Sequence, residues 1–242
     1  MKNNFAIARR KLLKLGALAL GTGLVTKATA SQANPIPKRG TIIAFEELAQ
    51  DATPEQVLEA LLAGNKRFVE NQLEAPNKNP ERLKEVSTEQ KPLVSIMSCS
   101  DSRVPLALVF DRGIGDLFVV RDAGNIATPE EIGSLEYGAF VLGTPVIMVL
   151  GHEKCGAVQA ALEGQSLPGQ MGSIVAAIQP AIERNSQDDS EEFYVETIKR
   201  NVMLQLENLQ ASPVLNDLVE QGKLKIVGAY YSLQTGEVSL IS

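Results

Sequence analysis

Hydrophobic positions along the chain alternate between a helical spacing and short, nearly unbroken runs. The unbroken runs predict strands, and they cover residues 93–98, 116–121, 145–150, 225–231 and 238–241. The helical spacing predicts helices over residues 54–71, 81–90, 129–143, 155–163, 174–184 and 191–209, with another between Ser212 and Gly222. Residues 105–110 are predicted to form a short helix or turn.

This alternation predicts an α/β fold with a mostly parallel sheet. Strands that read as continuous apolar runs are typical of parallel sheets covered by helices on both faces. Residues 116–121 belong to this group, because their run is too apolar to leave one face in water. The last strand follows a short turn at Gly236, so it should lie antiparallel at an edge. We therefore expect four parallel strands, one antiparallel edge strand and flanking helices.

The N-terminal region is predicted to be an export signal and not part of the fold. Residues 1–30 contain six basic residues and no acidic ones, then a short apolar stretch, and end in the small-x-small pattern Ala28-Thr29-Ala30. The pair Arg9-Arg10 resembles a twin-arginine signal. We expect cleavage before Ser31, a linker over residues 31–50, a single domain over residues 51–242 and a periplasmic or equivalent extracytoplasmic location.

Composition narrows the possible partners. Without residues 1–30 the chain has 17 basic and 29 acidic residues, which argues against nucleic-acid binding, since that requires a basic surface. The apolar part of the signal has about eleven residues, too few to cross a bilayer of roughly 30 Å as a helix. We therefore expect no stable transmembrane segment in the mature chain.

Two cysteines and one histidine follow the predicted strands. Cys99 ends the run that starts at Leu93, and His152 and Cys155 follow the run that ends at Leu150. Ligands in open α/β sheets bind at the carboxyl ends of the strands, so these side chains are expected to meet there. Two thiolates and an imidazole favour zinc, and three protein ligands leave a fourth position free, as in catalytic zinc sites. The alternative from the residues alone is a disulfide between the two cysteines in an exported protein.

Asp101 and Arg103 extend the first half of this candidate site. They follow Cys99 in a turn where a carboxylate and a guanidinium can form a charge-assisted hydrogen bond. Beside a metal, such a carboxylate would orient a water molecule, and the arginine would keep it ionised and away from the metal. The alternative interpretation is an aspartate that caps the turn next to a solvated arginine.

These residues resemble the β-class carbonic anhydrases. The similarity lies in CSDSRVP (residues 99–105) and GHEKCGAV (residues 151–158), and it extends over roughly residues 50–232. It implies one Zn²⁺ per subunit on Cys99, His152 and Cys155, with Asp101 and Arg103 controlling the fourth zinc position. It also implies a homodimer, often paired into a homotetramer.

The function expected from this resemblance is reversible hydration of CO2 to bicarbonate and a proton. A zinc-bound hydroxide would be the nucleophile, and the backbone N–H of Gly156 would contact the substrate oxygens. Three alternatives remain open: a hydrolase for CS2 or COS, a non-catalytic zinc-stabilised dimer, and a disulfide-linked protein without metal.

Overall fold

A computed structural model describes residues 52–182 and 190–241. The predicted signal over residues 1–30 and the predicted linker over residues 31–50 lie outside the described residues. Within the part that is described, no helix is long and apolar enough to cross a membrane.

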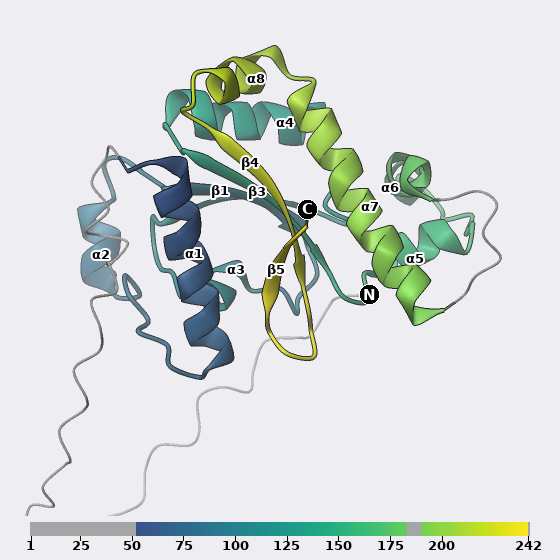
Figure 1. Cartoon of the computed structure of the whole chain (residues 1–242), viewed down its shortest axis with the longest axis horizontal. Coiled ribbons are helices and arrows are strands. Elements are labelled where there is room, and N and C mark those ends of the chain that lie inside the picture. The colour runs from purple at the N-terminus through teal and green to yellow at the C-terminus, as the bar shows by residue number, and fades with distance from the viewer. Residues whose placement is uncertain (1–51, 183–189, 242) are drawn as a thin grey trace, which may run out of the picture. The chain divides into compact units, whose positions relative to one another are not determined.

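A five-stranded sheet forms the centre of the fold (Figure 1). Its strands are β1 (Val94–Cys99), β2 (Leu117–Asp122), β3 (Val146–His152), β4 (Lys225–Tyr231) and β5 (Val238–Ile241). The spatial order is β2-β1-β3-β4-β5, in which the first four strands are parallel and β5 pairs antiparallel with β4 at the edge. The predicted fold class is therefore confirmed.

Helices cover both faces of this sheet. They are α1 (Pro54–Val69), α2 (Pro80–Glu85), α3 (Leu106–Val109), α4 (Pro129–Glu136), α5 (Gly156–Leu162), α6 (Met171–Ile178), α7 (Glu191–Gln210) and α8 (Pro213–Glu220). A π-helical turn, η1 (Tyr137–Val141), follows α4, and a 3-10 turn, η2 (Gln179–Ala181), follows α6. The first helix begins as its sequence indicates, with a reciprocal capping box between Thr53 and Gln56 and a proline at its first position.

Alternate side chains of the central strands enter two cores. Ile96 and Met148 pack with α1 and α3 on one face, whereas Met97 and Ile147 pack with α4, α7 and α8 on the other. A third apolar cluster lies at the carboxyl end of the sheet, against α5 and α6, and it contains Cys99 and Cys155. The candidate ligands are thus embedded in packed structure.

The structure differs from the sequence prediction at β2. The sequence predicts a strand that is covered on both faces, but none of its six residues is fully buried and Val119 is 45% exposed. The reason is topological, because β2 lies at the edge of the sheet and has a neighbour on one side only. Three predicted helices also end earlier: α2 ends at Glu85, α4 gives way to the π-helical turn after Glu136, and α6 ends at Ile178.

Candidate metal centre

The carboxyl end of β1 supplies the first ligand candidate. Cys99 is the last residue of a strand that is buried throughout, and it lies opposite Asp122 at the end of β2. Its sulfur accepts a hydrogen bond from the backbone N–H of Gly124, with 3.3 Å between nitrogen and sulfur. The guanidinium of Arg121 donates to the carbonyl oxygens of both Cys99 and Asp101, at 2.6 and 2.8 Å, and so fixes the turn between them.

The carboxyl end of β3 supplies the imidazole. His152 is fully buried, and its Nδ1 lies 2.8 Å from the carbonyl oxygen of Glu153. A carbonyl can only accept a hydrogen bond, so Nδ1 carries the proton and Nε2 presents a lone pair. Nε2 is buried and has no hydrogen-bond partner among the described residues. A buried nitrogen lone pair without a partner is available to bind a metal ion.

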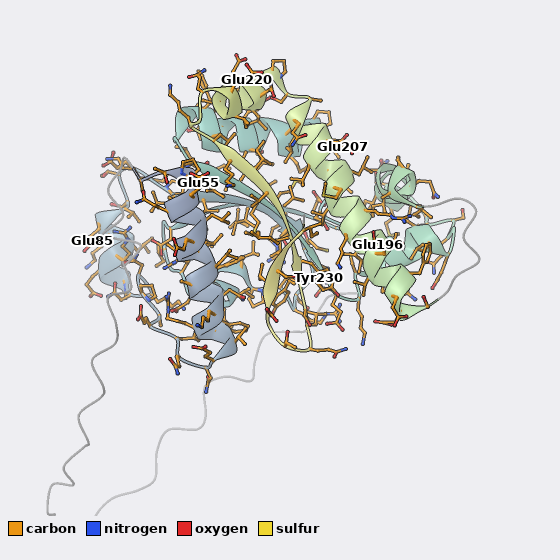
Figure 2. The ribbon with its side chains drawn as sticks, in the orientation of Figure 1. Glu55, Glu85, Glu196, Glu207, Glu220 and Tyr230 are labelled. Atoms are coloured by element: carbon orange, nitrogen blue, oxygen red, sulfur yellow. The ribbon has the colours of Figure 1, made fainter. Side chains whose placement is uncertain are left out.

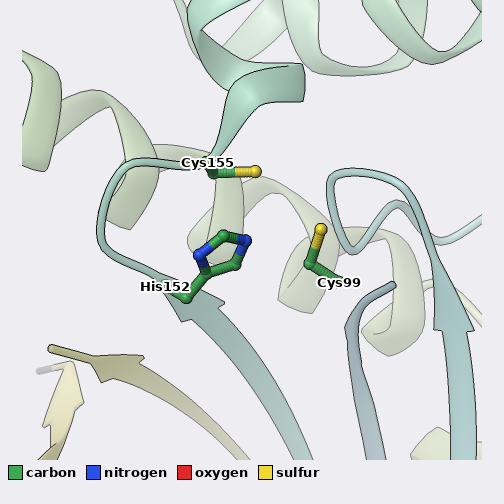
Figure 3. A group of neighbouring side chains, drawn as sticks. All are labelled: Cys99, His152 and Cys155. Carbon is green, nitrogen blue, oxygen red and sulfur yellow. The ribbon is translucent and has the colours of Figure 1, made fainter. Parts of the chain in front are cut away.

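The third candidate, Cys155, lies at the N-cap of α5, where the helix dipole favours a thiolate. The ligand atoms of Cys99, His152 and Cys155 all lie within 4.8 Å of one another, and Figure 3 shows them converging on one space. The closeness of the two sulfurs lowers the pKa of Cys99 and raises that of Cys155, and at Cys155 it outweighs the helix N–H groups that favour the thiolate. Two sulfurs and one imidazole nitrogen, all buried, form a set that fits zinc.

Asp101 and Arg103 form an ion pair beside the three candidate ligands. The Arg103 guanidinium donates to both carboxylate oxygens of Asp101, at 3.0 and 2.7 Å, and the Arg103 backbone N–H donates to the first of them at 2.8 Å. The guanidinium also reaches the carbonyl oxygen of Lys154 at 3.0 Å, which ties the β1 turn to the β3 turn. These bonds lower the pKa of Asp101 to about 2, so it is ionised at neutral pH. Its Oδ2 lies 3.9 Å from the free Nε2 of His152.

Two residues that support the candidate ligands were missed from the sequence. Glu153 lies between His152 and Cys155, and its buried carboxylate accepts hydrogen bonds from the β4–β5 turn. Tyr194, in α7, donates its hydroxyl proton to the carbonyl oxygen of Cys155 at 2.7 Å. Spacing along the sequence could not identify these partners, because their bonds join segments 39 and about 80 residues apart.

Fold and site together define an α/β protein with a Cys-His-Cys group at the carboxyl edge of a parallel sheet. The family model described as carbonic anhydrase matches residues 94–238 of this chain. Carbonic anhydrase 2 of Mycobacterium tuberculosis is 34% identical over 197 residues, covering 78% of this chain and 94% of that protein. A carbonic anhydrase of Mycolicibacterium smegmatis is 36% identical over 199 residues, covering 79% and 95%.

Solved structures give the same result. The β-carbonic anhydrase CafA of Aspergillus fumigatus superimposes with a TM-score of 0.64 at 26% identity, covering 76% of this chain and 90% of that one. The chain belongs to the carbonic anhydrase family, and within it to the β class. It is therefore a lyase of the family that hydrates CO2.

Proposed function

We propose that this chain hydrates CO2 with one zinc ion held by Cys99, His152 and Cys155. The observation that carries the proposal is the buried, unpartnered Nε2 of His152, which faces two sulfurs within 4.8 Å. Zinc in such a site lowers the pKa of a bound water molecule and so supplies a nucleophile at moderate pH. The side chains of this protein would hold the metal ion and orient the groups that react.

Asp101 would act as a fixed hydrogen-bond acceptor at this site. Since its pKa is held at about 2 by Arg103, its carboxylate has no proton to donate at neutral pH. An O–H group that enters the space between Asp101 and the ligands therefore turns its hydrogen toward the carboxylate and its lone pair away. Arg103 positions the carboxylate through three hydrogen bonds. We therefore propose that Asp101 orients the O–H group and that Arg103 holds Asp101 in place.

Gly156 is proposed to contact the substrate through its backbone. It is the first residue of α5, so its N–H has no partner within the helix. The glycine is exposed, and a Cβ placed on it would meet nothing within 4 Å, which leaves its N–H approachable beside Cys155. A bicarbonate oxygen could accept this N–H.

The decisive test is stopped-flow CO2 hydration by the mature chain, with zinc quantified in the same sample. We expect activity that follows zinc content and is lost in Cys155→Ser. Full activity in zinc-free protein would refute the proposal. The alternatives of CS2 or COS as substrate use the same residues, so the same samples should be assayed with those molecules. If CS2 or COS is turned over faster than CO2, that molecule replaces CO2 as the proposed substrate.

We also propose that the chain forms a dimer through the edge of the sheet at β2. The first four residues of this strand are apolar and none of them is fully buried. Beside it lies η1, in which Phe140 is 69% exposed and Val141 is 58% exposed. An unprotected apolar edge strand is a template for pairing, and two copies can pair symmetrically. Sedimentation should show Phe140→Glu as a smaller species than the native chain. An unchanged mass would refute this interface.

Export is proposed from the sequence of residues 1–30. The support is the basic and apolar order of the segment, with Arg9-Arg10 ahead of Ala28-Thr29-Ala30. Replacing both arginines by lysine should keep the protein out of the periplasmic fraction of a bacterial host. Equal export of this variant would refute the twin-arginine route.

A further inference from the structure

A row of buried polar side chains runs along the inner face of α7. Its members are spaced by four residues: Thr197, Asn201 and Gln205, each no more than 1% exposed. The outer face of the same helix carries Glu196 and Glu207 (Figure 2). A buried amide is costly unless it is hydrogen-bonded, so the partners of this row show what it does.

The two amides hold the loop that follows β2. The side-chain nitrogen of Asn201 donates to the carbonyl oxygen of Gly124 at 2.9 Å, and the side-chain oxygen of Gln205 accepts the N–H of Ala127 at 2.9 Å. The nitrogen of Gln205 donates to the oxygen of Asn201 at 3.0 Å. A backbone carbonyl only accepts and a backbone N–H only donates, so neither amide can be turned over without losing a bond. The two amides thus hold the loop at Gly124 and at Ala127.

This loop presents a hydrogen-bond donor to a metal ligand. The N–H of Gly124 lies 3.3 Å from the sulfur of Cys99. Gly124 has φ +86°, and a Cβ there would lie 2.8 Å from Ile178 and 3.0 Å from Ala157, so a side chain is excluded on two grounds. The position of this N–H therefore depends on what holds the loop.

We propose that Asn201 and Gln205 are positioning residues for the metal centre, acting through the N–H of Gly124 on the sulfur of Cys99. An N–H aimed at a thiolate fixes its direction and withdraws electron density from it. Hydrogen-bonded supports of metal ligands commonly change metal affinity by about 10–100-fold when removed. The inference rests on the proposed zinc site and adds two residues that touch neither metal nor substrate.

The test uses Gln205→Met and Asn201→Leu, which keep side-chain size and remove the amide. Thr197→Val is the matched control, because Thr197 is equally buried in the same row but bonds within α7, to the carbonyl oxygen of Phe193. Zinc affinity is measured by competition with a chromophoric chelator. The cobalt-substituted proteins are compared by their thiolate-to-cobalt absorption band. We expect about 10–100-fold weaker zinc binding and a shifted band in both amide variants, but native behaviour in the control.

A purely structural role would lower thermal stability in all three variants without moving the cobalt band. Native affinity and a native band in the amide variants would overturn the inference. If Asn201→Leu does not fold, Gln205→Met decides between the same two outcomes. Failure of the native chain to bind zinc would instead refute the proposed metal centre, so the two failures are distinguishable.

Discussion

The carboxylate of Glu153 should be a major source of stability for the loop that carries two of the three proposed ligands. It is 5% exposed and lies between His152 and Cys155. One of its oxygens accepts from the Ser232 hydroxyl at 3.0 Å and from the backbone N–H groups of Leu233 and Gln234 at 2.8 and 3.1 Å. The other accepts from the Gln234 side chain at 2.9 Å. The β3 turn is thereby bound to the turn between β4 and β5.

The substitution Glu153→Gln tests the charge while keeping the shape. The amide oxygen can replace the oxygen that accepts three bonds, and its nitrogen then faces the Gln234 amide, which can rotate. A hydrogen bond to a charged group contributes about 1.5–3 kcal/mol and a neutral one about 1 kcal/mol. Three bonds that each lose about 1 kcal/mol of charge assistance predict a loss of about 3 kcal/mol in the free energy of unfolding.

Urea unfolding of the metal-free chain at neutral pH measures this loss without a contribution from zinc binding. Glu237→Gln is the control, since it removes the same charge at an exposed position of the β4–β5 hairpin, which Glu153 contacts. The control should stay within about 0.5 kcal/mol of the native chain. A Glu153→Gln variant as stable as the control would show that the four bonds contribute little and would refute the reasoning.

Three further predictions concern activity and pH. Arg103→Lys cannot hold both oxygens of Asp101, so kcat/KM should fall about 10–100-fold while zinc content stays native; a native rate would contradict this. Burial raises the pKa of Asp111, but bonds from backbone N–H groups and Arg67 outweigh it and leave that pKa lowered. Asp111→Asn should therefore cost about 3 kcal/mol in urea unfolding at pH 7, and this difference should shrink as the pH falls below about 4. His152 is the sole histidine and a proposed ligand, so turnover should rise with buffer concentration, and buffer-independent turnover would exclude external proton transfer.

The sequence could predict the sheet and the three converging side chains for a simple physical reason. Parallel strands end at a common edge, so residues that directly follow two such strands become neighbours whatever their distance in the chain. Cys99 and Cys155 are 56 residues apart, yet their sulfurs lie within 4.8 Å. The Asp101–Arg103 pair was also predictable, because both partners lie in one turn and need no tertiary information.

The supports of these residues could not be predicted in the same way. The helical spacing of α7 identifies its apolar positions, but it does not indicate that Asn201 and Gln205 face inward as well. From the sequence, each residue could equally lie on a solvated face. Their inward orientation depends on the backbone groups that the loop after β2 leaves unpaired, which are the carbonyl of Gly124 and the N–H of Ala127. The edge position of β2 is similar, since an apolar run does not reveal how many neighbours a strand has.

One helix therefore connects the two halves of the candidate site. Near its N-terminal end, α7 bonds directly to the carbonyl oxygen of Cys155 through Tyr194, and two turns later it reaches Cys99 through the loop at Gly124. Its packing is close because β3 carries Gly151 beneath it, where a Cβ would lie 2.7 Å from Val202. Cys99, at the end of β1, and Cys155, at the N-cap of α5, are thus both linked by hydrogen bonds to one helix. These bonds help to fix the separation of the two sulfurs, and a tetrahedral ligand set requires a fixed separation.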